Sequence, residues 1–238
     1  FAVVLAQRAD GDQVWVRADL DASVVRRPRA TLDASRPFAA LHFQSTPAQL
    51  LGAVREPLGL WRRVRDRAAV WVAFEQLGCA DAALEMAVAY ARERRAFGRA
   101  IGAYQGIKHK LADLYTANQM ARVHAYYGAW ALGLDAQPGA AAAPELPAAA
   151  AAARVAATRA CSLAAQEALH VLGGMGYTWE ADAHLFYRRA RQLAVVLGHE
   201  HAWGERLVGL LEERLAADSR ATGAATGPTP AGATDRAT

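Results

Sequence analysis

The sequence predicts a mainly α protein, in which an up-down four-helix bundle follows a partial β domain. Three observations predict it. Residues 1–45 alternate like strands between turn residues, and from about Gly59 the apolar residues follow a helical period. The helical stretches are long and their connections short, as in bundles. We therefore expect part of a β domain over 1–46, a helical bundle over 47–217 and a disordered tail over 218–238.

The first segment contains the predicted strands. Phe1–Gln7 is a short apolar run, residues 10–12 (Asp-Gly-Asp) are a turn signal, and Gln13–Leu20 alternates. Further strands are expected over Val24–Arg26 and Phe38–Phe43. So few strands form no stable sheet alone, and the chain opens inside a strand-like run without methionine. We expect it to be a fragment whose neighbouring strands lie upstream.

Helical periodicity fills the second segment. The first long helix is expected from about Gly59 to near Phe97, and the second over Tyr104–Leu134. After a loop around 137–147, an alanine-rich helix is expected over 148–171 and further helical segments over 182–197 and 200–216. The expected stripe of the first helix contains Leu60, Val64, Arg67, Trp71, Phe74 and Gly78, and the second helix should bury Ile107, Leu111, Leu114 and Ala121.

Bulk composition narrows the function classes. The 238 residues are 53% hydrophobic, and their net charge of +4 is scattered, so nucleic-acid binding is not expected. Every apolar run is too short to span a membrane and no secretory signal is evident, which favours a cytoplasmic protein. Cys79 and Cys161 lie in apolar helical contexts and are expected to be buried, and no metal-ligand spacing is present.

The segment Arg92–Leu114 is the most informative for function. Arg94 and Phe97 are three residues apart, which would place both on one side of a helical turn. A guanidinium suits phosphate oxygens, and an aromatic ring offers a flat contact for a base. Gly98 and Gly102 allow a tight turn. The residues fit a nucleotide diphosphate at a helix–helix corner, but composition alone favours a helical hairpin with a solvated basic end.

Three ordered motifs resemble one family. Arg94–Asp113 resembles the R-x-x-F-G-x-x-I…Q…LAD signature of acyl-CoA dehydrogenases. Leu172–Glu180 is similar to the family's GGxGYTxE block, and Tyr187–Arg191 to its YRDAR block, with Arg189 in place of the aspartate. Thr31–Arg36 is similar to the family's TLDxTR. The resemblance runs from about residue 1 to about residue 215.

The resemblance implies FAD as the cofactor. Arg94, Phe97 and Gln105 match positions that contact the diphosphate and adenine of a neighbouring subunit's FAD. Gly173 and Gly174 match the glycine pair close to the diphosphate or ribityl chain. His170 occupies the place of a nucleotide-binding glutamine; it could donate one hydrogen bond or be a purely structural histidine.

The family's catalytic carboxylate has no counterpart at its usual positions. Removal of the α proton needs a base within hydrogen-bond reach. By resemblance, the base positions are Leu197 and Ala68, and neither side chain accepts a proton. Asp66 is the substitute candidate, against a solvated role beside Arg63 or Arg67. Other candidates are Glu75, which also reads as a helix-surface or bundle-buried polar residue, and His199 and Glu200, which follow Leu197.

Three functions follow from the resemblance. The first is an FAD-dependent acyl-CoA dehydrogenase that desaturates an acyl-CoA thioester, passes electrons to an electron-transfer flavoprotein and works as a homo- or hetero-oligomer, dimer or tetramer. The alternative is a non-catalytic subunit that supplies scaffold and FAD contacts to a heteromeric partner, which the absent carboxylates favour. A relative acting on a nitroalkane or an amine is a third reading that no local motif selects.

Overall fold

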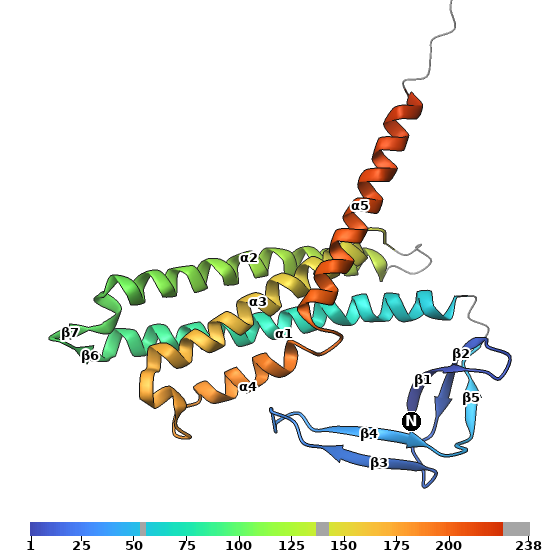
Figure 1. The fold of residues 1–238 in the computed structure, drawn as a ribbon, viewed down its shortest axis with the longest axis horizontal. Coiled ribbons are helices and arrows are strands. Elements are labelled where there is room, and N and C mark those ends of the chain that lie inside the picture. Colours follow the sequence, from blue (N-terminus) through green and yellow to red (C-terminus); the bar gives the residue numbers. More distant parts are fainter. Residues whose placement is uncertain (53–55, 137–142, 226–238) are drawn as a thin grey trace, which may run out of the picture.

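The computed structural model describes residues 1–52, 56–136 and 143–225. A small β segment leads into a set of helices, of which three are long and lie side by side (Figure 1). The mainly α prediction is confirmed. The predicted loop residues 137–142 and tail residues 226–238 lie outside the described residues.

The β segment contains two antiparallel sheets. Strands β1 (Ala2–Gln7), β2 (Gln13–Ala18) and β5 (Ala48–Leu50) form one sheet in the order β1-β2-β5. Strands β3 (Val24–Arg29) and β4 (Phe38–Phe43) form the other, with Val24 opposite Phe43. The predicted turn at residues 10–12 is confirmed: Gly11 has a φ of 93°, which a glycine adopts without strain. Strand β5 was not predicted, because its three residues are too short to show a period.

Five α-helices follow in the part of the chain that the structure describes. They are α1 (Pro57–Glu93), α2 (Gln105–Asp135), α3 (Leu146–Leu172), α4 (Ala183–Leu193) and α5 (Glu200–Ala225). Helix α3 contacts all four others, so it forms the centre of the bundle. The predicted disorder from residue 218 onward is wrong for residues 218–225, because α5 continues to Ala225. The alanine-rich composition suggested disorder, but alanine also has a high helix propensity, which explains the error.

Alanine dominates the interfaces between the long helices. One core cluster joins α1, α2 and α3 almost entirely through buried alanines, such as Ala73, Ala125 and Ala157. Small side chains allow helix axes to approach closely. The buried face of α1 includes Ala69, Ala73 and Ala80, whereas Trp71 is 68% exposed. The stripe predicted from the large apolar residues is therefore mostly on the surface, although the inner face predicted for α2 is confirmed.

Candidate functional site

The chain leaves α1 earlier than predicted and folds into a tight hairpin. Strands β6 (Arg95–Ala96) and β7 (Arg99–Ala100) pair around Phe97 and Gly98, whose φ values are 50° and 82°. Two successive positive φ values are typical of a type I′ hairpin turn. The placement of Phe97 on a helical turn with Arg94 is therefore wrong. The Ile101 N–H donates to the Arg94 carbonyl at 2.8 Å, so the chain turns back there.

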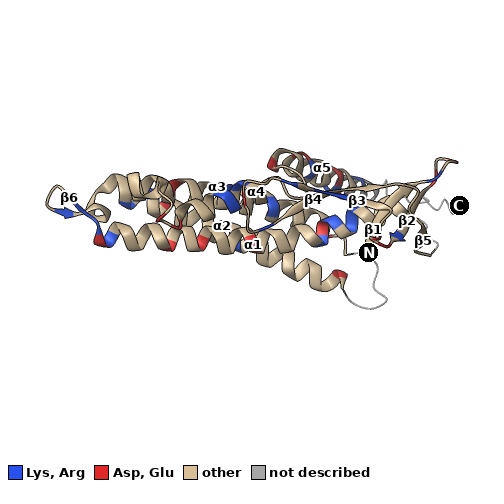
Figure 2. Cartoon of the chain, turned by 90° about the horizontal axis from the view of Figure 1, so that it is seen from below, with Lys and Arg blue, Asp and Glu red and all other residues tan. Residues whose placement is uncertain are grey.

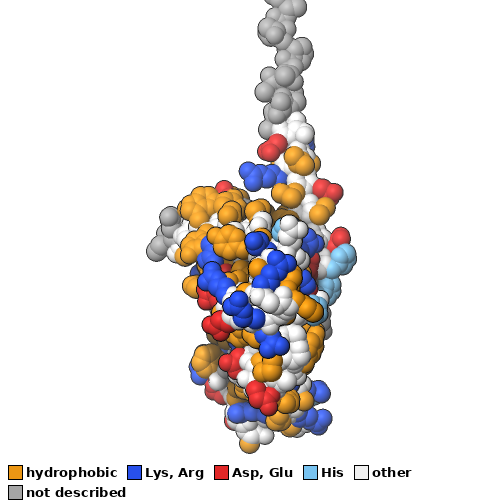
Figure 3. Space-filling view, turned by 90° about the vertical axis from the view of Figure 1, so that its left-hand side faces the viewer, with side chains coloured by type: hydrophobic (Ala, Val, Ile, Leu, Met, Phe, Trp, Pro, Cys, Tyr) orange, Lys and Arg blue, Asp and Glu red, His pale blue; other side chains and the backbone are white. Residues whose placement is uncertain are grey.

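Phe97 is held at the tip of this hairpin with its ring in solvent. Its side chain is 97% exposed, and its positive φ is unfavourable for a residue with a Cβ. The Tyr104 hydroxyl donates to the Ala96 carbonyl at 2.9 Å and fixes the turn. Basic residues surround it: Figure 2 shows them at the β6 end, and Figure 3 shows Lys and Arg side chains on the face seen from that end. A strained, exposed aromatic residue in basic surroundings is a candidate contact for an anionic aromatic ligand.

A cavity of about 470 Å³ lies beside the hairpin and brings together two predicted site elements. Arg94 lines it together with Gly173 and Gly174. A Cβ built on either glycine would have no atom within 4 Å, so the space over this backbone is open. No carboxylate among the described residues pairs with Arg94. An unpaired guanidinium beside approachable backbone suits a phosphate group.

The turn that carries these glycines follows directly from α3. Gly173 ends the helix with a φ of 62°, and η2 (Gly173–Tyr177) continues as a 3₁₀ turn. Gly176 packs against the preceding helix, where a Cβ would lie only 2.6 Å from the Leu169 carbonyl oxygen. Gly176 is thus needed for packing, whereas Gly173 supplies the positive φ at which α3 ends.

His170 and Gln105 lie near the cavity but do not line it. His170 Nδ1 is 3.2 Å from the Glu167 carboxylate, which also binds Lys110 of α2. Although burial works in the opposite direction, hydrogen bonds from Lys110 and His170 hold the pKa of Glu167 below its ordinary value. Gln105 is the exposed first residue of α2. We call Arg94–Gln105 together with His170–Met175 the hairpin corner.

The two positions that the resemblance assigns to the base, Leu197 and Ala68, lie at a second place, where α1 meets α5. Leu197 has a φ of 63° and packs into an apolar cluster that includes Trp203 and Phe74. Ala68 is half-buried on α1. We call Arg63–Ala68 together with Leu197–Arg206 the α5 corner. The side chains around Leu197 in this cluster are apolar, and leucine itself can neither accept nor donate a proton.

Asp66 lies in the α5 corner and is 2% exposed. Its Oδ2 accepts from Arg206 at 2.6 Å, while Oδ1 is buried without a hydrogen-bond partner among the described residues. Burial raises the pKa of Asp66 above its ordinary value even though Arg206 works to lower it. The alternative reading, a solvated partner of Arg63 or Arg67, is wrong. Both arginines bind the fully buried Asp135 carboxylate instead, at 3.0 and 2.8 Å.

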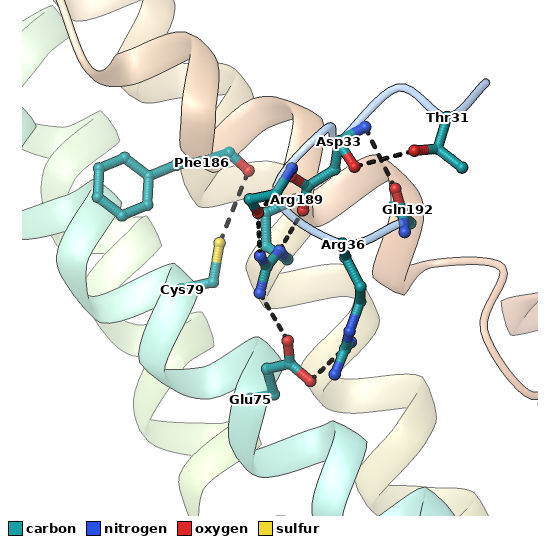
Figure 4. Close-up of polar contacts among 9 residues, drawn as sticks. Thr31, Asp33, Arg36, Glu75, Cys79, Phe186, Arg189 and Gln192 are labelled. Carbon is teal, nitrogen blue, oxygen red and sulfur yellow. Dashed lines mark hydrogen bonds and ion pairs between the residues drawn. The ribbon is translucent and has the colours of Figure 1, made fainter. Parts of the chain in front are cut away.

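Glu75 is part of a polar network that joins the β segment to the helices (Figure 4). Its two oxygens bind Arg189 of α4 at 2.8 Å and Arg36 at 3.1 Å. Arg189 also binds Asp33, whose pKa stays below its ordinary value because hydrogen bonds from Ser35 and Arg189 outweigh the effect of burial. The prediction that Glu75 is a polar residue buried in the bundle is therefore close to the observed role. Both of its carboxylate oxygens are bound to arginines.

The two candidates after Leu197 are also engaged. Glu200 binds Arg159 of α3, and His199 Nδ1 accepts from the Ala202 N–H at 3.3 Å at the start of α5. A histidine that accepts through Nδ1 helps to cap the helix, since the first N–H groups of a helix lack partners within it. Neither residue faces the hairpin-corner cavity.

Sequence reasoning missed a second cavity, of about 560 Å³, between the β3–β4 ribbon and α4. Its walls come from segments about 150 residues apart, so no local spacing could reveal it. The TLDxTR match could have pointed to this cavity, because its residues Thr31 and Leu32 line it. The remaining wall residues are Arg29, Phe38, Ala39, Ala40, Arg191, Gln192, Val195 and Val196.

Comparison with known proteins identifies a consistent group. A family model described as the acyl-CoA dehydrogenase C-terminal domain matches residues 64–202. Acyl-CoA dehydrogenase IpdE2 of Mycobacterium tuberculosis is 39% identical over 171 residues, which are 72% of this chain and 47% of that protein. Acyl-CoA dehydrogenase FadE34 of the same organism is 37% identical over 204 residues, 86% of this chain and 27% of that protein. The chain thus spans half or less of these relatives.

Solved structures agree on the fold. The structure of the Tcur3481-Tcur3483 steroid ACAD G363A variant superposes with a TM-score of 0.75 and 27% identity, over 90% of this chain and 55% of that one. Butyryl-CoA dehydrogenase from Megasphaera elsdenii gives a TM-score of 0.75 at 23% identity, over 88% and 55%. Among the described residues, no helix is long and apolar enough to cross a membrane, and no cluster of side chains is suited to a metal ion.

Proposed function

Because the chain belongs to the acyl-CoA dehydrogenase family, we propose that it is part of an FAD-dependent enzyme that desaturates an acyl-CoA thioester between its α and β carbons. In this proposal the electrons pass to an electron-transfer flavoprotein, and the protein acts as a homo- or hetero-oligomer in the cytoplasm. The activity belongs to the whole protein, since the chain spans half or less of its curated relatives.

The observation that carries the proposal is the cavity of the hairpin corner. Arg94 faces it without a carboxylate partner among the described residues, and Gly173 and Gly174 leave open space where side chains would stand. These residues fit a diphosphate group that approaches both the guanidinium and the bare backbone. In this proposal the FAD is the one bound by an adjoining subunit. Arg94 would hold its diphosphate, and Phe97 would pack against its adenine.

Gln105 and His170 complete the proposed contact set. Gln105 opens α2 next to the hairpin, and His170 lies one turn before Gly173. The His170 imidazole is fixed through Nδ1 by Glu167, so its other nitrogen is the atom available to a nucleotide. Bound FAD would supply the hydride acceptor, and the protein must supply binding, orientation and removal of the α proton.

Removal of that proton is the part that this chain supports least. Leu197 and Ala68 cannot perform it, and the oxygens of Glu75 are occupied by arginines. Asp66 meets one requirement of a base, a pKa raised by burial, and lacks the other, since its carboxylate is enclosed and bound to Arg206. In the proposed enzyme the base is Asp66 after a local opening of the α5 corner, or a carboxylate of another subunit.

The packing of Leu197 favours a second candidate function. Its side chain is part of an apolar cluster with Trp203, so the position is built into the helical core. A subunit of this kind would contribute FAD contacts and scaffold to a heteromeric acyl-CoA dehydrogenase whose partner carries the base. The Tcur3481-Tcur3483 protein, 27% identical to this chain, is named for two proteins and as a steroid ACAD, so a polycyclic acyl-CoA should be tested beside a straight-chain one.

One experiment tests both functions. The purified protein is examined for bound flavin and is then mixed anaerobically with straight-chain and polycyclic acyl-CoA thioesters while the visible flavin absorbance is recorded. Bleaching of the protein alone supports the enzyme, and bleaching only after a second subunit is added supports the scaffold. A protein that retains no flavin, alone or with candidate partner subunits, would contradict both.

A further inference from the structure

One wall residue of the second cavity has a buried polar atom without a hydrogen-bond partner among the described residues. The cavity lies between the β3–β4 ribbon and α4 and is lined largely by apolar side chains such as Phe38, Val195 and Val196. Gln192 of α4 also lines it and is only 8% exposed. Its Nε2 is buried and has no hydrogen-bond partner among the described residues.

The orientation of the Gln192 amide is fixed by its neighbours. The Asp33 backbone N–H donates to Oε1 at 3.2 Å, and a backbone N–H can only donate. The carbonyl end of the amide must therefore face Asp33, and the two N–H groups of Nε2 must point elsewhere. Arg189 and the Ser35 hydroxyl bind the Asp33 carboxylate, so the loop that sets this orientation is itself held in place (Figure 4).

A buried donor without an acceptor destabilises a fold, and it becomes useful when a ligand supplies the acceptor. We propose that the second cavity binds the apolar part of a carbonyl-bearing ligand, and that Gln192 Nε2 donates a hydrogen bond to the carbonyl oxygen. Because Nε2 has almost no accessible surface, the Gln192 side chain must rotate slightly as the ligand enters. Gln192 is thus a specificity-determining residue, and Asp33 and Arg189 position it.

The location of the cavity connects it to the proposed function, on which this inference rests. Val195 and Val196 in its wall directly precede Leu197, which occupies the family's base position. Two sources of the carbonyl are therefore available in the assembled enzyme: the flavin ring and the acyl group of the substrate. Both are apolar or aromatic bodies that carry a carbonyl, and both fit a mainly apolar cavity with one amide donor.

The test uses two probes and a spectroscopic signal that does not depend on turnover. The side-chain amide resonance of Gln192 in ¹⁵N-labelled protein is assigned by its loss in Gln192→Met. FAD is titrated into flavin-free protein in one arm, and 2-decanone or decane into FAD-loaded protein in the other. Gln119→Met, on α2 and far from the cavity, is the matched control.

We expect the resonance to shift with FAD if the flavin supplies the carbonyl, or with 2-decanone if the acyl group does. The effective ligand should bind about tenfold more weakly to Gln192→Met and equally to Gln119→Met and wild type, since one hydrogen bond is removed. In the second arm, wild type should prefer 2-decanone to decane by a similar factor. If Gln192→Met fails to fold, Gln192→Glu, which keeps an acceptor for the Asp33 N–H and lacks Nε2, assigns the resonance and takes its place in the binding comparison.

A resonance that neither probe moves would overturn the inference, as would equal binding of 2-decanone and decane by wild type when FAD has no effect on the resonance. Failure of the proposed function looks different. In that case flavin is not retained at the hairpin corner, or no acyl-CoA bleaches it in the assembled protein, whatever happens to the Gln192 amide.

Discussion

The hairpin corner and the α5 corner differ in how much of their polar chemistry is left free. In the hairpin corner Arg94 has no carboxylate partner among the described residues, and Phe97 stands almost wholly in solvent. In the α5 corner Asp66 is bound to Arg206, while Arg63 and Arg67 bind the buried Asp135. The first corner leaves a guanidinium and an aromatic ring free to contact something outside the chain, whereas the second joins its carboxylates to arginines of its own fold, although Asp66 Oδ1 stays without a partner among the described residues. Cofactor contact is therefore better supported than catalysis.

The largest expected effect tests whether the α5 corner is structural. Asp135→Ala removes the carboxylate that accepts from Arg63, Arg67 and the Ala143 N–H, and Arg63 keeps only its hydrogen bond to the backbone carbonyl of residue 135. We expect the free energy of unfolding to fall by about 2–4 kcal/mol, measured by chemical denaturation. Glu212→Ala, at an exposed site on α5, should change it by less than about 0.5 kcal/mol. Equal effects of the two changes would show that the corner does not depend on this network.

The next effect concerns the missing base. Leu197→Glu places a carboxylate at the family's usual position, where a positioned base contributes about 100-fold or more to a proton transfer. We expect flavin reduction by acyl-CoA to accelerate by about that factor in stopped-flow measurements, with Leu197→Gln as the control of similar size. If Leu197→Glu binds FAD and reduces it no faster than Leu197→Gln does, the missing carboxylate is not what limits this corner.

A smaller effect separates function from packing at Phe97. Phe97→Gly relieves a positive φ at an exposed residue, so the free energy of unfolding should rise by about 1 kcal/mol. The same change removes the aromatic face proposed for adenine, and FAD affinity should fall about tenfold. Calorimetry and flavin titration measure the two quantities. If the free energy of unfolding and the FAD affinity both rise or both fall, Phe97 has no binding role separate from its effect on stability.

The smallest effect concerns the loop beside the second cavity. The pKa of Asp33 is lowered in the folded protein, so its contribution is complete above the unfolded value of about 3.9 and is lost as the pH falls through the lower folded value. At neutral pH, Asp33→Asn should cost about 0.5–1 kcal/mol of unfolding free energy. That difference from wild type should shrink on acidification below about pH 4. A difference that stays constant in acid would rule out the charge of Asp33 as its source.

Much of the fold could be predicted from the sequence, because strand alternation and helical period are local signals. The boundaries of α2 and α3 agree with the predictions to within about two residues. The buried face of α1 could not be predicted in this way, because the largest apolar residues suggest one face while close packing selects another. Trp71 is exposed, and Ala73 is fully buried.

The candidate site, too, could be predicted only in part. The glycine loop and Arg94 were predicted through motifs, and the structure brings them to one cavity. The hairpin at Phe97 was missed, because the same residues are also compatible with a helix that continues through Arg94 to Phe97 and a turn that begins at Gly98. The cavity at Gln192 could not be predicted, because Asp33 and Gln192 are 159 positions apart and meet only through the tertiary fold.

The most direct test of the contrast between the two corners is the flavin content of Arg94→Ala after gel filtration of the assembled protein, compared with wild type and with Arg214→Ala on the exposed part of α5. Loss of one charge-assisted hydrogen bond should weaken FAD binding about 10- to 100-fold, so Arg94→Ala should lose most of its flavin while the other two retain it. Equal flavin stoichiometry in all three proteins would contradict the assignment of the hairpin corner to FAD.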